Sequence, residues 1–254
     1  MATELQRSIA FRTSFARRQA TSVREVDGGF VVRNDEFPLS YEHNQLHLDG
    51  TGFDPAGIVA LADDALSYAD HRLVTVYDDA LGAACVPLLV AAGYQHGTEL
   101  VMHHAGPAPA EPPAVPAGPV EVAELAAPYG ARLREWMPEL GEEGVRQLVE
   151  RRDARLRGAE QVLFLAARTP AGEVAAWADL YLDPPTGTAQ IEDLITALEH
   201  TRHGYADTVL ATALHRAAGV ELRFLIADGE DWPQYWYGRR GFTVIGRGHS
   251  FTRN

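Results

Sequence analysis

Residues 191–214, IEDLITALEHTRHGYADTVLATAL, join a short apolar run to a loop with small residues and then to an amphipathic helix pattern. Gly204 and Ala206 allow a backbone to approach a ligand closely, and a helix that begins beside them presents free N–H groups. Such donors, together with the helix dipole, suit a pyrophosphate. An ordinary strand-to-helix turn needs the same spacing, so the local pattern leaves both interpretations open.

The second half of the chain predicts a definite order of elements around this loop. Apolar residues on one face, such as Val209 and Leu214, predict a helix over 207–219. We expect helices before residue 160, broken near Pro128 and Pro138. The remaining expected elements are antiparallel strands at 161–168, 174–182 and 189–196, a strand at 221–228, a short helix at 233–240 and a last strand at 242–253.

The first half shows a thinner version of the same pattern. Apolar and turn residues predict strands at 28–34, 44–50, 71–79 and 99–104, with helices at 55–68 and 82–92. The ends of the halves align, with Leu73–Val76 on Leu222–Leu225 and Gly93-Tyr94 on Gly241-Phe242. We therefore favour an internal duplication, although any two α/β segments contain similar units. We expect domains at 1–104 and 120–254, joined by a Pro/Ala-rich linker at 105–119.

Two motifs resemble those of the GNAT superfamily of N-acyltransferases. The segment Thr201-Arg202-His203-Gly204-Tyr205-Ala206 resembles motif A, in which Arg or Gln is followed, after two intervening residues, by Gly-x-Gly/Ala. Thr201 stands where the family prefers Arg or Gln, and the neighbouring Asp207 opposes a pyrophosphate. Tyr237-Gly238-Arg239-Arg240-Gly241-Phe242 resembles the end of motif B, although aromatic residues before a glycine also simply fill cores.

The resemblance implies an α/β (α+β) fold of two GNAT-like domains, each a mixed, mostly antiparallel sheet flanked by helices. It implies that acetyl-CoA is the co-substrate, with its pantetheine arm paired to Leu194, Ile195 and Thr196 and its pyrophosphate in the loop. The implied residues of that loop are Thr201, Arg202, His203, Gly204, Tyr205 and Ala206.

Acyl transfer requires a group that protonates the leaving thiolate and a group that accepts the amine's proton. The resemblance implies Tyr237 as the acid, and it favours Glu192 over Asp193 as the base. Strand alternation predicts that only one of these two carboxylates faces the cleft; both are otherwise edge-strand charges. A backbone N–H near Leu194 would polarise the thioester carbonyl.

We therefore expect an acetyltransferase that acts on a primary amine, in particular of a small molecule. The alternative is a non-catalytic acyl-CoA-binding or regulatory protein that has kept the fold. The corresponding loop of the first half is acidic and contains Asp49 and Asp54, so we expect no cofactor there. A monomer and a homodimer both remain open, because one half can mimic a partner of the other.

The composition narrows the partners. A formal net charge of −13 over 254 residues argues against nucleic-acid binding. No apolar run approaches the roughly 20 residues that span a bilayer, and the first residues do not resemble a secretory signal, so we expect no membrane partner and a cytoplasmic location. The histidines show no convincing metal spacing, and the single cysteine, Cys85, lies in an apolar helix and suits a core.

Overall fold

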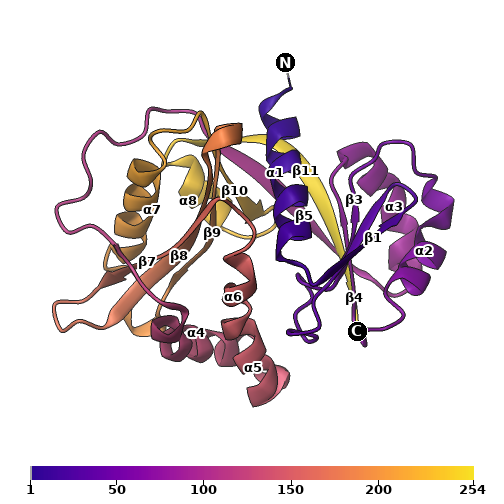
Figure 1. Ribbon diagram of the computed structural model, residues 1–254, viewed down its shortest axis with the longest axis horizontal. Coiled ribbons are helices and arrows are strands. Elements are labelled where there is room, and N and C mark those ends of the chain that lie inside the picture. Colours follow the sequence, from indigo (N-terminus) through magenta and orange to yellow (C-terminus); the bar gives the residue numbers. More distant parts are fainter. Residues whose placement is uncertain (1) are drawn as a thin grey trace. The chain divides into compact units, whose positions relative to one another are not determined.

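The computed structural model describes residues 2–254, coloured along the sequence in Figure 1. The contacts divide the chain into two compact units, one made of the residues through His104 together with Ile226–Asn254, and the other of Ala105–Leu225. One boundary between the two units lies between His104 and Ala105, where the sequence predicts the start of the linker. The expected domain of residues 120–254, however, contributes its last segment, from Ile226 onward, to the first unit.

The first unit begins with a helix that the sequence did not suggest and ends with the last strand of the chain. The elements are α1 Glu4–Gln19, β1 Ser22–Val26, β2 Gly29–Arg33, β3 Gln45–Leu48, η1 Pro55–Gly57, α2 Ile58–Ala65, β4 Arg72–Val76, α3 Asp79–Ala91, β5 Gln95–His104, α8 Pro233–Gly238 and β11 Phe242–Arg253. Thr3 starts α1 with a capping box that includes Gln6.

The sheet of the first unit has the order β1-β2-β3-β4-β11-β5, in which only β3 and β4 pair in parallel. Glu99 on β5 forms an ion pair with Arg12 of α1, with 2.6 Å between nitrogen and oxygen. His249, the cross-strand partner of Thr98, instead contacts Asp79 of α3. Because neighbouring strand residues face opposite sides, α1 and α3 cover opposite faces of this sheet.

The second unit places its longest helix before three antiparallel strands. The elements are β6 Gly118–Pro119, α4 Val122–Trp136, η2 Pro138–Leu140, α5 Gly141–Glu150, α6 Arg152–Arg155, β7 Gln161–Arg168, β8 Val174–Asp183, η3 Pro184–Thr186, β9 Thr188–Thr196, η4 Leu198–His200, α7 Tyr205–Arg216 and β10 Leu222–Asp228, whose last residues belong to the first unit.

The strands β6 to β9 pair antiparallel in sequence order, and β9 pairs in parallel with the first residues of β10. On one face, α4 and α5 bury an apolar cluster against the sheet around Tyr129, Phe164 and Trp177. The helix α7 packs on β7, β8 and β9 through the face that the sequence predicted, with Val209 and Leu214 buried. Burial of these faces outweighs the weak local preference of each element.

The predicted fold class, a mixed and largely antiparallel sheet flanked by helices, is confirmed. The predicted break at Pro128 is wrong, because α4 continues through it. Proline removes one N–H bond there, but Leu125, Tyr129 and Leu133 pack into the core on either side and hold the helix together. No helix in the described part of the chain is both long and apolar enough to cross a membrane.

The segment expected to be a linker lies against the second unit. Its backbone carbonyl at Pro109 lies 2.9 Å from the His215 ring nitrogen Nδ1, and the Ala117 N–H donates to the Thr212 hydroxyl at 3.0 Å. Both partners belong to α7. The segment 105–117 has no helix or strand, as its prolines predict, but it is bonded to this helix at two points.

Candidate functional site

The loop before α7 has the geometry of an open helix N-terminus. Gly204 is the N-cap residue, with a φ of 84°, and no side chain caps the helix. A Cβ atom built on Gly204 would meet no heavy atom within 4 Å. Arg202 also has a positive φ, 64°, so the loop turns through the left-handed region twice before the helix starts. The turn is therefore exposed, and no side chain fills it.

Backbone donors gather at this N-terminus. Thr208 donates its N–H to the Gly204 carbonyl, which closes the first helical turn. Among the described residues, the N–H groups of Gly204, Tyr205 and Ala206 have no hydrogen-bond acceptor, as the start of a helix requires. The Arg202 side chain is exposed beside them. Unpaired N–H groups, the helix dipole and one guanidinium together fit two linked phosphates.

The strand β9, which leads into this loop, is bulged. Its ladder with β8 jumps from the pair Asp179–Glu192 to the pair Trp177–Ile195, so Asp193 and Leu194 together oppose one residue of β8. Asp193 has a φ of 50°. A bulge leaves one residue out of the ladder and turns its backbone groups. The ladder between β9 and β10 ends at Ile191 and Leu225, so the bulge lies just beyond it.

The bulge changes which way the two acidic residues face. Strict alternation predicted that Glu192 and Asp193 point to opposite sides of the sheet. Glu192 pairs with Asp179, and cross-strand partners share a face. Asp193 accepts hydrogen bonds from the same arginines as Asp179, so both carboxylates lie on the face covered by α4 to α6. The alternation argument was therefore wrong here, because it assumes a regular strand.

Sequence reasoning missed a buried ionic network beside the bulge. Arg152 Nε donates to Asp179 at 3.0 Å and Arg152 Nη2 to Asp193 at 2.8 Å. Arg155 Nη1 donates to both aspartates, at 2.6 and 2.7 Å. Burial disfavours the charge of Arg152, but the carboxylates of Asp179 and Asp193 outweigh it and raise the pKa of Arg152 above its ordinary value. The available signal was the spacing of Arg152 and Arg155, which lie seven residues after the apolar Val145 and Leu148 and so continue the same helix face.

Glu192 itself is half-buried and accepts a hydrogen bond from the Gln190 side chain, which lies two residues earlier on the same strand face. Tyr181, across from Gln190, donates its hydroxyl to Asp179 at 3.1 Å. Burial raises the pKa of Tyr181 well above its ordinary value. Glu192 thus lies on the same face of the sheet as three other polar side chains, those of Asp179, Tyr181 and Gln190.

Tyr237 lies on α8 in the first unit, whereas Glu192 and Gly204 lie in the second. Its ring is half-buried and contacts Trp236 and Phe242 edge-on, with centroids 5.1 and 5.7 Å apart. Gly241 has a φ of 88°, which only glycine adopts easily, and turns the chain from α8 into β11. The proposed acid of the reaction therefore stays a prediction, and so do the other site residues.

The remaining candidates for chemistry behave as structural residues. Cys85 is buried in α3, and burial raises the pKa of its thiol to about 11. A thiol at such a pKa is a poor nucleophile near neutral pH. The described residues include no group of three or more histidine, cysteine or acidic side chains that could hold a metal ion.

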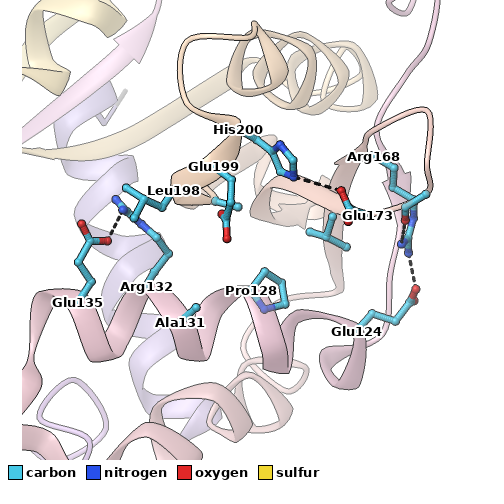
Figure 2. A pocket seen from close by; sticks show the side chains of 13 residues that line it. Glu124, Pro128, Ala131, Arg132, Glu135, Arg168, Glu173, Leu198, Glu199 and His200 are labelled. Atoms are coloured by element: carbon cyan, nitrogen blue, oxygen red, sulfur yellow. Dashed lines mark hydrogen bonds and ion pairs between the residues drawn. The ribbon is translucent and has the colours of Figure 1, made fainter.

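A hollow of about 770 Å³ opens at the end of β9, between α4, the β7–β8 hairpin and η4. Figure 2 shows Arg168 facing Glu124, and Arg132 facing Glu135, in two ion pairs. His200 lies 3.6 Å from the Glu173 carboxylate. None of the predicted site residues lines this hollow. The hollow therefore gives no evidence about where the cofactor binds.

Comparisons with known proteins identify a family for part of the chain and similar folds for nearly all of it. Residues 126–242 match the profile of the Acetyltransferase (GNAT) family. A functionally unknown conserved protein from Staphylococcus epidermidis ATCC 12228 is 14% identical with a TM-score of 0.70, over 93% of this chain and 94% of that chain. A GCN5-related N-acetyltransferase from Kribbella flavida is 18% identical with a TM-score of 0.62, over 96% and 94%. No curated protein sequence matches the chain.

The structural likeness shows the fold, and it extends over both halves of the chain. The family match places part of the chain in the acyltransferase class. More specifically, the chain carries an acetyltransferase domain of the GNAT family at residues 126–242.

Proposed function

We propose that this protein transfers an acetyl group from acetyl-CoA to a primary amine of a small molecule, by direct attack of the amine on the thioester. The open N-terminus of α7 carries the proposal. Its unpaired N–H groups at Gly204, Tyr205 and Ala206 and the exposed Arg202 offer the donors that a pyrophosphate needs. The bulged end of β9 offers backbone groups for the pantetheine arm.

The reaction follows from these groups. The amine nitrogen attacks the thioester carbon, and Glu192 accepts the amine's proton directly or through one water. The carbonyl oxygen gains negative charge, which an N–H near Leu194 at the bulge stabilises. The carbon–sulfur bond then breaks, and Tyr237 protonates the departing thiolate. The products are the acetylated amine and CoA. Glu192 then releases its proton to solvent and Tyr237 takes one up, which restores both groups.

The ionic network supports Glu192 as the base. Asp193 accepts hydrogen bonds from both Arg152 and Arg155, and charge-assisted bonds of this kind stabilise a carboxylate in its ionised form. A carboxylate held in that way is a weak proton acceptor. Glu192 accepts a hydrogen bond from a neutral amide, that of Gln190.

The first test is binding. A ligand that binds only the folded protein stabilises it, by about 2.7 kcal/mol at 100 times the Kd. We expect acetyl-CoA to raise the melting temperature and titration calorimetry to give one site. No stabilisation at saturating acetyl-CoA would contradict the proposal.

The second test is turnover. Release of CoA thiol with a panel of primary amines reports acetyl transfer, and the only cysteine, Cys85, is buried and adds little background. The chain contains no lysine, so acetylation of its own lysine side chains cannot account for thiol release. If acetyl-CoA binds but no amine causes thiol release, the non-catalytic acyl-CoA-binding or regulatory alternative is favoured. Thr201 and Asp207, where the loop departs from the family motif or opposes a pyrophosphate, would then be the first residues to mutate.

The third test addresses the acid. Tyr237→Phe removes the proton donor and should lower kcat about 100-fold with little effect on acetyl-CoA binding. Tyr235→Phe, on the same helix but exposed, is the matched control and should keep full activity. Full activity of the Tyr237 variant would remove this residue from the mechanism.

A further inference from the structure

The two arginines of α6 are placed where a folded protein rarely accommodates charge. The side chains of Arg152 and Arg155 are 0% and 1% exposed, and that of Asp179 is 0% exposed. Asp193 is the only one of the four that reaches solvent, at 20%. Two guanidiniums face two carboxylates, so the formal charges cancel within the network. The Arg152 guanidinium also lies over the Tyr129 ring, 4.3 Å from its centroid, which fixes the arginine from the α4 side.

Stability alone is a weak reason for such a network. Removing charges from water costs free energy that the ion pairs only partly return, and apolar side chains of similar volume often serve as well. Buried ionic groups instead hold one arrangement of the chain, because a displaced partner leaves a charge unpaired in the interior. Here the held arrangement includes the backbone of β9 at Asp193.

The backbone at Asp193 needs such support. A non-glycine residue at a φ of 50° is strained, and residues of this kind persist when the surrounding structure holds them. The carboxylate of Asp193 receives one hydrogen bond from each arginine, and both arginines are also bonded to Asp179 on the neighbouring strand β8. The network thus joins the two strands at the position where their ladder skips a residue.

We infer that Arg152 and Arg155 are positioning residues, which hold Asp193 in its left-handed conformation and so aim the backbone N–H groups of the β9 bulge at the thioester carbonyl. The role in catalysis rests on the proposed function. The support of Asp193 by the two arginines rests only on the hydrogen bonds among α6, β8 and β9. The arginines touch no reacting atom in this scheme. They act through Asp193, and the neighbouring Glu192 is oriented by the same turn of the strand.

The inference predicts a selective defect. CoA and acetyl-CoA share the pyrophosphate and the pantetheine arm, but only acetyl-CoA has the carbonyl that the bulge would bind. A loosened bulge should therefore reduce the preference for acetyl-CoA over CoA. The affinity for CoA should fall less, because CoA loses only the pantetheine contacts of β9 and not the contact with the thioester carbonyl. It should also lower kcat more than it raises the KM for acetyl-CoA, because the carbonyl oxygen gains charge in the transition state.

Three variants of Asp193 separate conformation from charge. Asp193→Ala removes the carboxylate and disfavours the positive φ, Asp193→Asn keeps a side chain that tolerates this φ, and Asp193→Gly adopts it freely. We expect kcat to fall at least tenfold in the alanine variant, to fall less in the asparagine variant and to recover partly in the glycine variant. The pair Arg155→Met with Asp193→Asn removes one charge of each sign and should resemble the alanine variant.

Hydrogen exchange gives a readout that needs no ligand. The amides of residues 192–196 should exchange at least tenfold faster in the alanine and paired variants, while those of α7 remain unchanged. The matched control is Arg134→Met with Glu142→Gln, which breaks an exposed pair between α4 and α5 and should change neither exchange at β9 nor kcat. If the alanine variant does not fold, the asparagine and paired variants decide the question.

Wild-type exchange at residues 192–196 together with wild-type kcat in the asparagine and paired variants would overturn the inference and leave the proposed function intact. Failure of the wild-type protein to bind acetyl-CoA would instead overturn the proposed function and with it the catalytic part of the inference. The exchange rates would still show whether α6 holds the bulge.

Discussion

Both halves of the chain contain a strand, a loop, a helix and a second strand that pairs in parallel with the first. In the first half these are β3, α2 and β4, and in the second half β9, α7 and β10. In each half the next helix is followed within three residues by a glycine with a positive φ, Gly93 at 86° and Gly241 at 88°, and then by a long strand. The same local architecture is thus built twice.

The two halves differ in the turn that leads into this helix. In the first half the capped residues belong to η1, which runs directly into α2; the N-cap residue of α2 itself, Gly57, has no side-chain cap. In the first half the carboxylate of Asp54 accepts the Ala56 N–H at 3.0 Å, and the backbone carbonyl of Asp54 accepts the Gly57 N–H at 3.0 Å. In the second half Gly204 supplies no side chain, and the corresponding donors stay open. The β–α–β arrangement is common to both halves, so the proposed phosphate site differs from the first-half loop in whether its backbone donors are already bonded. This supports the prediction that the first half binds no cofactor.

Converting one cap into the other should have the largest effect. Gly204→Asp places a carboxylate beside the open N–H groups, where it would compete for them and repel the pyrophosphate. We expect the affinity for acetyl-CoA, measured by calorimetry, to fall about 100-fold, which corresponds to about 2.7 kcal/mol. Gly204→Asn has the same shape without the charge and should lose much less. Equal losses in both variants would show that backbone strain, not charge, is responsible.

The strands that lead into the two loops also differ. The strand β3 carries a buried histidine, His47, whereas β9 contains no histidine. Burial, followed by the charges of Arg12 and Arg17, lowers the pKa of His47 from 6.5 to about 3. Below pH 6.5 the unfolded chain binds a proton at His47 that the folded chain rejects, so stability falls as the pH falls toward 3. The loss should reach about 2 kcal/mol at pH 5, measured by urea denaturation and by hydrogen exchange in β3.

His47→Gln should remove this acid sensitivity, because glutamine does not titrate. His203→Gln changes an exposed histidine and serves as the control. An unchanged difference in stability between pH 7 and pH 5 in the His47 variant would assign the acid sensitivity to another group.

Local patterns predicted most of the elements because apolar periodicity and turn residues act over short distances. The buried face of α7 and the strands β7 to β10 follow from them. The placement of β11 between β4 and β5 does not, since strand order depends on contacts far apart in sequence. Helix α1 was missed because its polar and basic residues hide a weak apolar stripe that includes Phe11 and Phe15.

The candidate site divides in the same way. Gly204 and Ala206 were predictable, because small residues at a strand-to-helix junction have a local physical meaning. The bulge at Asp193 was not, since no glycine or proline marks it and its positive φ depends on two arginines about 40 residues earlier in the chain. A long-range ionic network leaves no periodic signal, only charged residues at positions where a helix should be apolar.

Removing the cap of the first half provides the reverse of the Gly204 experiment. Asp54→Ala frees the Ala56 N–H and should lower the unfolding free energy by about 1 kcal/mol, the usual value of an N-cap. We expect no binding of acetyl-CoA to appear at this loop, because Asp49 remains nearby in sequence and no arginine follows. Calorimetry on the double variant Asp54→Ala with Gly204→Asp, in which the second loop should no longer bind the cofactor, would detect any new site. A new site with micromolar affinity would show that the cap alone had excluded the cofactor.

The smallest effect concerns the loop position at which this sequence departs from the family motif. The Thr201 hydroxyl donates to the Leu198 carbonyl at 3.2 Å, a bond that closes the turn after η4 but offers nothing to a phosphate. Thr201→Arg would add a cation next to Arg202 and should strengthen acetyl-CoA binding about threefold at low salt. Because the added charge is exposed, the gain should disappear at about 0.5 M salt, where screening is strong. Thr201→Val, which removes the hydroxyl without adding charge, is the control. A gain that survives high salt, or one that the valine variant shares, would mean that the residue acts on the shape of the turn and not on the phosphates.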